Sequence, residues 1–564
     1  MNQPMIRITA LILLVASSLA RRTAVAQDPT VDPFAAAARH GLSELPPPGR
    51  ADSERMRESL LRLYDSASVR PLWTGRAGPT PQALEVITAL SAADTRGLLP
   101  ADYDADSLRS GAAGLATAPG DVVRQAEFDI ALSRSLIRFL SDLHMGRVDP
   151  RSLGVELPDT HQQLDLAALA LMVSRASNPA AVIASAEPPY AGYAALIDEL
   201  ARYRRFVADP TLRPPALTGG AIRPGDRYED AANLARFLTA VGDLGPGVPL
   251  ERDAAGVALY NGALLDGVIE FQRRHGLEPD GVIGRATRAA LAVPLARRAR
   301  QIELTLERWR WLPDRPPSRY AVVNVPAFRL LVFEQDSIAR QPVLAMNVIV
   351  GQADGRHATP LFTATMREVV LRPYWDVPPR IARVELLPPI RRDPAYLERE
   401  GLEIVHGGDY DAVVHPSTDE SLDRVALGTL RLRQRPGPNN ALGLVKFVFP
   451  NRYNVYMHGT PARALFARAR RDFSHGCIRV EDPTALAEHV LRGQTEWSRG
   501  AIEAAMNGDS TVHIPLARPV GVYILYATAV AGDGGAIRFH ADLYGHDARL
   551  ERALARPAPS SDSR

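Results

Sequence analysis

The chain has 564 residues, of which 46% are hydrophobic and 23% charged, a composition typical of folded globular proteins. Because single hydrophobic cores stop growing at about 250 to 300 residues, this length predicts three or so domains. The formal net charge of +2, from nearly equal numbers of acidic and basic residues, excludes the strongly basic surface of nucleic-acid-binding proteins, so we expect no nucleic-acid partner.

A short apolar stretch, Ile8 to Ala20, precedes the small residues Ala24-Val25-Ala26. This pattern predicts a cleaved signal peptide over residues 1–26 and therefore an exported protein. An uncleaved N-terminal anchor is the competing interpretation, although the stretch is shorter than the ~20 residues of a spanning helix. We expect no stable membrane span after cleavage.

Helical periodicity dominates the first third of the chain. Apolar residues recur every three or four positions between about residues 46 and 206, which predicts helices. A stretch rich in proline and glycine, residues 209–224, predicts a linker. We assign residues 27–227 to a helical scaffold domain. The periodic apolar residues include Ile130, Leu132, Leu136, Leu140 and Leu143.

A compact helical unit is predicted over residues 228–293. Leu264, Val268 and Phe271 form an apolar helical face that leads to the turn Pro279-Asp280-Gly281. A connecting helix, with Trp309 and Trp311, is expected within residues 294–317.

Short runs rich in Val, Ile, Thr and Phe then predict a mostly β domain over residues 318–515. A charged segment with prolines, about residues 380–425, interrupts the runs and is either a lid over an active site or a surface excursion. A helix is expected at Thr484–Leu491. The expected strands are Tyr320–Val325, Phe328–Phe333, Val343–Val350 and Phe362–Met366.

The end of the chain is predicted to form a β hairpin over residues 516–550, with its turn at Gly532-Asp533-Gly534-Gly535. Residues 551–564 are predicted to be a disordered tail.

The only cysteine of the chain, Cys477, stands in the run Ser474-His475-Gly476-Cys477, and a second histidine, His458, lies upstream. A free thiol of pKa about 8.5 is only a few per cent ionised at neutral pH, so a nucleophilic cysteine needs a nearby base. Cys477 as a small buried hydrophobe is the plain alternative. Its polar and conformationally permissive neighbours disfavour that alternative.

Outside the cell a lone cysteine has no partner in its own chain and remains available as a thiol. His458 and His475 lack carboxylate or cysteine partners at the spacing of a zinc site, so we expect neither a metal nor a cofactor.

The order His458-Gly459, Ser474-His475-Gly476-Cys477 and Arg479 resembles the signature of the LD-transpeptidases. These are bacterial cysteine enzymes that join peptidoglycan stem peptides through diaminopimelate. Residues 432–447 and 372–378 resemble the large branch of that family. Gly459 stands where that branch has an aspartate, so no carboxylate follows the histidine.

The resemblance implies an α+β multidomain protein. It would contain a mostly β catalytic domain, an α-helical N-terminal scaffold, a three-helix peptidoglycan-binding module at residues 228–293 and a capping subdomain inserted near residues 380–425. The residues that resemble the peptidoglycan-binding module are Phe271-Gln272, Gly276-Leu277, Asp280-Gly281 and Thr287. The apolar positions of this unit would equally suit a plain helical bundle. Peptidoglycan stem peptides and glycan strands would be its partners, the periplasm its location and carbapenems its acylating inhibitors.

Roles for individual residues follow from the same resemblance and from their chemistry. Cys477 would attack the donor carbonyl, His458 would accept the thiol proton, and the Gly459 carbonyl would orient the imidazole. Amides near Gly476 and Cys477 would hold the oxyanion.

The roles of the neighbouring residues stay open. His475 would shape the oxyanion site or hold the loop, with proton transfer as an alternative. Arg479 would bind a substrate carboxylate or hydrogen-bond the cysteine loop, and Ser474 would stabilise the turn or line the substrate site. Pocket lining is implied, by similarity alone, for Tyr456, Trp375 and Asn440.

Two further functions remain compatible with the sequence. Hydrolysis by the same cysteine would make the protein an LD-carboxypeptidase or a cross-link hydrolase. A wall-binding protein without catalysis is disfavoured by the intact motif. The oligomeric state does not follow from the sequence.

Overall fold

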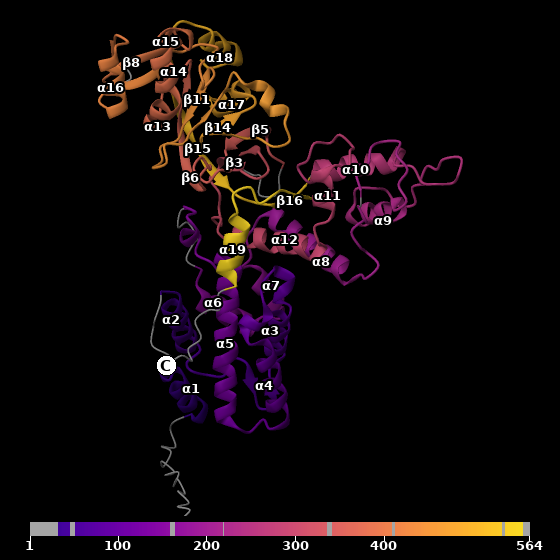
Figure 1. Ribbon diagram of the computed structural model, residues 1–564. Coiled ribbons are helices and arrows are strands. Elements are labelled where there is room, and N and C mark those ends of the chain that lie inside the picture. The colour runs from indigo at the N-terminus through magenta and orange to yellow at the C-terminus, as the bar shows by residue number, and fades with distance from the viewer. Residues whose placement is uncertain are drawn as a thin grey trace, which may run out of the picture.

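The computed structural model describes residues 32–45, 51–157, 164–217, 219–334, 341–408, 412–532 and 536–555. A helical stalk, a smaller helical module and a β-rich domain with an inserted subdomain follow one another along the chain (Figure 1). The expected α+β multidomain class is confirmed. The predicted signal peptide, residues 1–26, lies outside the described residues. Within the described ranges, no helix has both the length and the apolar character to cross a membrane.

The stalk is built around α5 (Val122–Met145), which is capped by Asp121 and ends at Gly146 with φ +80°. The apolar side chains that recur along α5 are buried, so the helical period read from the sequence is the period of the core. The surrounding helices are α1 (Pro33–Ser43), α2 (Ala51–Ser66), α3 (Pro81–Ser91), α4 (Ala105–Thr117), α6 (Leu166–Arg175) and α7 (Pro179–Ala184).

A second core joins the helical module to its neighbours. Helix α8 (Ala191–Ala208), expected in the scaffold, packs with the module helices α9 (Ala231–Val241), α10 (Gly262–Arg274) and α11 (Arg285–Leu291). Within the module the Gln272 amide donates to Asp280 and to Thr287, at 2.9 and 3.1 Å. These polar residues therefore fasten the turn after α10 to the start of α11.

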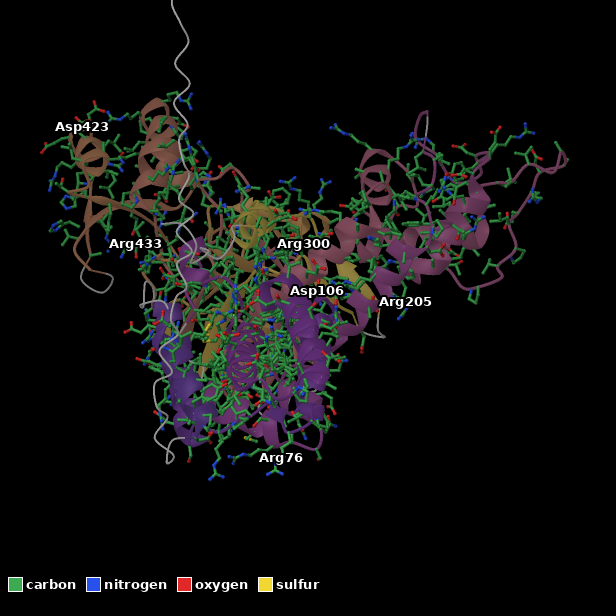
Figure 2. All side chains as sticks on the ribbon, turned by 90° about the horizontal axis from the view of Figure 1, so that it is seen from below. Arg76, Asp106, Arg205, Arg300, Asp423 and Arg433 are labelled. Atoms are coloured by element: carbon green, nitrogen blue, oxygen red, sulfur yellow. The ribbon has the colours of Figure 1, made fainter. Side chains whose placement is uncertain are left out.

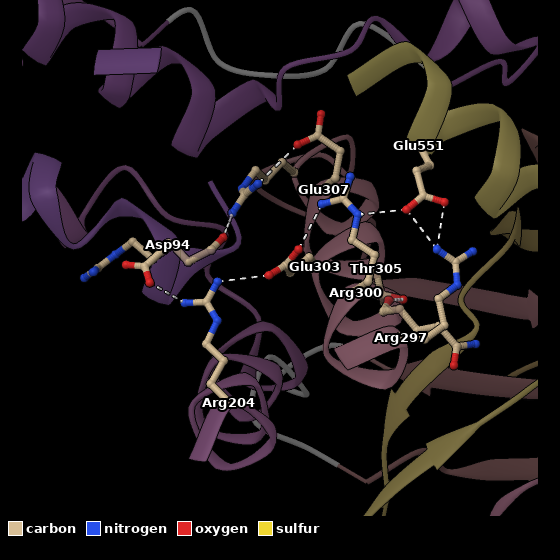
Figure 3. Close-up of polar contacts among 11 residues, drawn as sticks. Asp94, Arg204, Arg297, Arg300, Glu303, Thr305, Glu307 and Glu551 are labelled. Carbon is tan, nitrogen blue, oxygen red and sulfur yellow. Dashed lines mark hydrogen bonds and ion pairs between the residues drawn. The ribbon is translucent and has the colours of Figure 1, made fainter. Parts of the chain in front are cut away.

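Helix α12 (Leu295–Trp309) lies between α8, the stalk residue Asp94 and the C-terminal helix α19 (His546–Leu554), as Figure 3 shows. Arg204 of α8 pairs with both Asp94 and Glu303, at 3.0 and 2.9 Å. Arg297 and Arg300 pair with Glu551 of α19, at 2.7 and 3.3 Å. The charged face of α12 thus holds separate segments of the chain in fixed positions.

The β-rich domain is one sheet in the order β13-β5-β14-β12-β11-β6-β15-β3-β4, closed into a barrel because β4 also pairs with β5. Branched side chains such as Val323, Val348 and Val369 fill its interior. The strands are β3 (Arg319–Asn324), β4 (Arg329–Glu334), β5 (Leu344–Gly351), β6 (Phe362–Leu371), β11 (Val445–Val448), β12 (Met457–His458), β13 (Asp472–Ser474), β14 (Ile478–Val480) and β15 (Val512–Leu525).

The insert between β6 and β11 is a subdomain with its own core, which includes Val377, Ile390, Ile404 and Leu432. It is longer than the predicted 380–425, because β7 (Trp375–Asp376) at its start pairs with β10 (Arg431–Gln434) at its end. Its other elements are α13 (Pro379–Ile381), the π-helical turn η4 (Ala382–Leu386), α14 (Leu387–Arg392), α15 (Ala395–Arg399), β8 (Leu402–His406), β9 (Val413–His415) and α16 (Asp419–Leu427).

The C-terminal prediction is corrected in two respects. Strand β15, expected in part to form the hairpin, lies inside the barrel sheet between β6 and β3, and only β16 (Ala529–Ala531) and β17 (Ile537–Phe539) form the hairpin. Residues 551–554 are the last turn of α19 and not a disordered tail. The turn residues 533–535 and the rest of the tail, 556–564, lie outside the described residues.

Candidate active site

The register of three strands brings the two halves of the sequence motif together. Strands β12 and β14 are parallel, with His458 opposite Arg479, and β11 lies on the other side of β12, with Lys446 opposite His458. Side chains two positions apart on a strand share a face. Tyr456 and Cys477, which directly precede β12 and β14, therefore fall on the face of His458, Arg479 and Lys446.

Cys477 is half-buried, at the turn before β14. Burial raises the pKa of its thiol above the ordinary value, while hydrogen bonds donated by Tyr456 and the charges of Lys446 and Arg479 oppose that rise. The resting group is therefore a thiol, and the surrounding donors and cations are arranged to favour the thiolate once its proton is removed.

His458 is 4% exposed, and its Nδ1–H donates to the Gly459 carbonyl at 2.6 Å. This is the contact anticipated for Gly459, and it places the ring proton on Nδ1 and the lone pair on Nε2. Burial, and after it the nearby Arg479 cation, lower the pKa of His458 to about 3, so the imidazole is neutral at physiological pH. Among the described residues there is no hydrogen bond between His458 and the Cys477 sulfur; such contacts commonly tighten only with substrate bound.

Arg479 is half-buried, and its Nε is buried without a hydrogen-bond partner. Burial lowers the pKa of the guanidinium, and Cys477, in its thiolate form, opposes that lowering. Within the described ranges no carboxylate pairs with Arg479. An unpaired guanidinium beside the thiol favours the substrate-carboxylate role over a hydrogen bond to the cysteine loop.

The turn that carries Cys477 is held from inside by Ser474, which is 2% exposed. The Ser474 hydroxyl donates to the Cys477 carbonyl at 2.5 Å and accepts from the Gly476 amide at 3.2 Å. Gly476 has φ +115°, a conformation that a side chain would strain. Because the Gly476 amide is engaged by Ser474, the Cys477 amide is the better oxyanion donor of the two.

His475 contacts the insert through its Nε2. Its Nε2 lies 2.9 Å from Glu385 Oε1 in η4. Its ring meets His357 edge to face, with ring centroids 4.7 Å apart, and His357 Nδ1 lies 2.6 Å from Asp354 Oδ2. Among the described residues no group of three histidine, cysteine or carboxylate side chains is arranged to hold a metal ion.

Tyr456 lies beside the nucleophile. Burial, and then Cys477, raise the pKa of its phenol, which accepts a hydrogen bond from Trp375 and donates one to the sulfur. The Lys446 ammonium lies 4.5 Å from the centroid of the Tyr456 ring. Tyr456 therefore contacts both Cys477 and Trp375, and the lining of a substrate pocket by these two aromatic residues stays a prediction.

Asn440 has a different role from the expected pocket lining. It is 1% exposed, and its side-chain amide donates to the backbone carbonyls of Pro373 and Arg435 at 3.2 and 3.0 Å. Its Oδ1 accepts from the Leu442 amide at 2.8 Å. Asn440 is therefore consumed in fastening its own loop to the base of the insert, and this corrects the prediction.

Three residues of the site were missed from the sequence. Thr359 accepts from the Gly351 amide and donates to the Gly476 carbonyl, both at 2.9 Å, and so braces the turn from outside. Glu385 lies in the insert, 90 residues before its partner His475. Lys446 had a visible signal, because it is the only lysine of the chain.

Three segments of the chain match known protein families. Residues 318–514 match the L,D-transpeptidase catalytic domain, residues 58–200 match a domain described as a scaffold domain, and residues 228–291 match a "Putative peptidoglycan binding domain". The insert, the face around Cys477 and the barrel strands from β3 to β14 lie within the first of these matches, whereas β15 begins inside it and extends beyond it.

One curated relative is a Haemophilus influenzae protein named "Putative L,D-transpeptidase". It is 30% identical over 255 residues, which are 45% of this chain and 49% of the relative. The chain thus spans about half the length of the curated relative that it matches.

Proposed function

The chain belongs to the L,D-transpeptidase family through its catalytic domain, and we propose that it forms cross-links between diaminopimelate residues of peptidoglycan stem peptides through a Cys477 thioester. The observation that carries the proposal is the shared face of Cys477, the neutral His458 and the unpaired Arg479. It combines a nucleophile, a base of fixed tautomer and a site for a substrate carboxylate.

In the first half-reaction, His458 Nε2 takes the proton of the Cys477 thiol as the sulfur attacks the carbonyl of diaminopimelate. That carbonyl is amide-linked to the terminal D-alanine of the donor stem. The Cys477 amide holds the oxyanion, and loss of one such donor typically costs about 3 to 4 kcal/mol. The imidazolium then protonates the leaving amine, D-alanine departs and a thioester remains.

In the second half-reaction, the side-chain amine of another stem attacks the thioester, the C–S bond breaks and the cross-link forms. The module at residues 228–291 would hold glycan strands near the catalytic domain, which raises the local concentration of stem peptides. The same substrate supports our proposal that the protein works in the periplasm after export.

Hydrolysis of the thioester is the alternative, because water needs no binding site and every residue above would serve it equally. The product would then be a tripeptide, as from an LD-carboxypeptidase, or a cleaved cross-link. Wall binding without catalysis is the weaker alternative, since it would leave the half-buried, unpaired Arg479 and the oriented His458 without a purpose.

The deciding experiment is incubation of the purified protein with a disaccharide-tetrapeptide, followed by mass spectrometry of the products. A transpeptidase yields free D-alanine and a dimer joined through two diaminopimelates, with some tripeptide. Tripeptide alone, at all substrate concentrations, would identify the hydrolase. No D-alanine at all would leave wall binding as the function.

A further inference from the structure

The second half-reaction poses a proton problem that His458 solves poorly. An acceptor amine resembles a lysine side chain, with a pKa of about 10, and reaches the site as an ammonium that cannot attack a thioester. The pKa of His458 is about 3, and the Arg479 cation beside it repels a second cation. A base away from Arg479 would serve the acceptor better.

The structure contains a second imidazole with the geometry of a base. An ionised carboxylate accepts hydrogen bonds but donates none, so the 2.9 Å contact with Glu385 places the His475 proton on Nε2. Nδ1 of His475 then carries the lone pair. This is the arrangement in which a carboxylate fixes the tautomer and the orientation of a catalytic histidine.

The position of His475 also suits an approaching amine. His475 is exposed, whereas His458 is buried, and Gly476 alone separates it from Cys477. The nearby carboxylates of Glu385 and Asp354 favour a cation, whereas Lys446 and Arg479 lie on the face of His458. Glu385 lies in a π-helical turn, a rare conformation that is frequent at functional sites.

We propose that Glu385 is a positioning residue that orients His475 as the base for the acceptor amine, so that the insert completes the second half-reaction. This inference rests on the transpeptidase function proposed above. The acceptor ammonium gives one proton to His475 Nδ1, and the neutral amine attacks the thioester carbon. The C–N bond forms, the C–S bond breaks, and the second proton of the amine goes to the departing Cys477 thiolate. His475 returns its proton to solvent.

A purely structural contact between the insert and the cysteine turn is the competing explanation. Loss of a structural contact would slow acylation by the donor and aminolysis by the acceptor alike. Loss of an oriented base would slow aminolysis alone, and only for amines that arrive protonated. The two explanations therefore differ in a ratio of rate constants and not in overall activity.

The test compares Glu385→Gln with a matched control, Asp423→Asn. Like Glu385, Asp423 is a carboxylate of the insert that forms an ion pair. Its partner is Arg391, and it lies at the outer edge of the insert (Figure 2). Acylation is measured as the burst of D-alanine without acceptor. Aminolysis is measured by adding acceptor to the preformed acyl-enzyme and following its decay by intact-protein mass spectrometry. Two acceptors are used, a stem peptide and methoxyamine, which is unprotonated at neutral pH.

We expect Glu385→Gln to slow aminolysis by the stem peptide about tenfold more than it slows acylation, and to shift products towards tripeptide. With methoxyamine the excess loss should shrink to less than threefold. Equal losses in acylation and aminolysis, equal losses with both amines, or behaviour identical to Asp423→Asn would overturn the inference. A wild-type protein that forms no acyl-enzyme would instead overturn the proposed function itself.

Discussion

His458 and Arg479 lie opposite each other on the parallel strands β12 and β14, so that the base of the site is held next to a fixed positive charge. That charge adds to burial in lowering the pKa of His458 to about 3. A substrate carboxylate bound to Arg479 would cancel the charge and make His458 a stronger base only when the donor is present. Substrate binding and base strength are thereby coupled through one guanidinium.

The first prediction concerns the pH dependence of acylation. His458 must be neutral to accept the thiol proton, and its lowered pKa keeps it neutral down to about pH 4, so the wild-type acylation rate should not fall between pH 7 and pH 5. Arg479→Gln removes one of the two main causes of the lowered His458 pKa. The acylation rate of this variant should therefore begin to fall at a higher pH than that of the wild type. The measurement is the rate of the D-alanine burst at donor concentrations well below the KM, where the rate reports the free enzyme, from pH 7 down to about pH 3. An acid limb at the same pH in both proteins would contradict the coupling.

Arg479 also makes a prediction about the substrate. Arg479→Gln should raise the KM for the donor stem about 10- to 100-fold, which is the loss of one charge-assisted pair. Donors amidated at either free carboxylate, that of the terminal D-alanine or that of the diaminopimelate side chain, identify the partner, because one of them should bind both proteins equally. Thermal stability should not decrease, since the mutation removes an unpaired half-buried charge.

Replacement of the nucleophile should separate chemistry from folding. Cys477→Ala should abolish D-alanine release and carbapenem acylation, because it is the only thiol of the chain. Circular dichroism and melting temperature should remain within a few degrees of wild type, since the side chain is small and half-buried. A covalent carbapenem adduct on the variant protein, seen by mass spectrometry, would refute the assignment.

Removal of the insert is straightforward to design from the strand register. Asp376 and Arg433 pair across β7 and β10, so a two-residue Asn-Gly turn between them can replace residues 377–432. The barrel should remain folded because the insert has its own core. Dimer formation should fall far more than the melting temperature. A folded deletion protein with wild-type dimer yield would show the insert to be a surface excursion.

The part of the candidate site that could be predicted from residue order is the local part. Cys477, Ser474 and Gly476 are consecutive or nearly so, and the turn between them follows from their side chains and from the freedom of glycine. His458 could be joined to them only by resemblance, since the parallel pairing of β12 with β14 is a long-range contact. Glu385 and Thr359 could not be predicted because they too contact the cysteine turn through long-range contacts.

The errors have two physical causes. Asn440 was expected to line the pocket because its segment resembles the family, but a family resemblance does not distinguish a side chain that binds substrate from one that fastens a loop. Gln272 and Thr287 are a second example. They carry the resemblance to the peptidoglycan-binding module, but in the structure they hydrogen-bond each other and hold a turn. The limits of the insert were misjudged because β7 and β10 are too short to give a strand signal.

Strand β15 is the last strand of the barrel along the chain, yet it lies between β3 and β6, the former about 200 residues earlier. The barrel therefore cannot close progressively as the polypeptide emerges from the ribosome; it must wait for Val512–Leu525. Cys477 is synthesised before that strand. During synthesis the Cys477 thiol is therefore present before the barrel that sets its environment is complete. The pairing of strands so far apart in the chain gives a high contact order, which predicts slow folding of the catalytic domain.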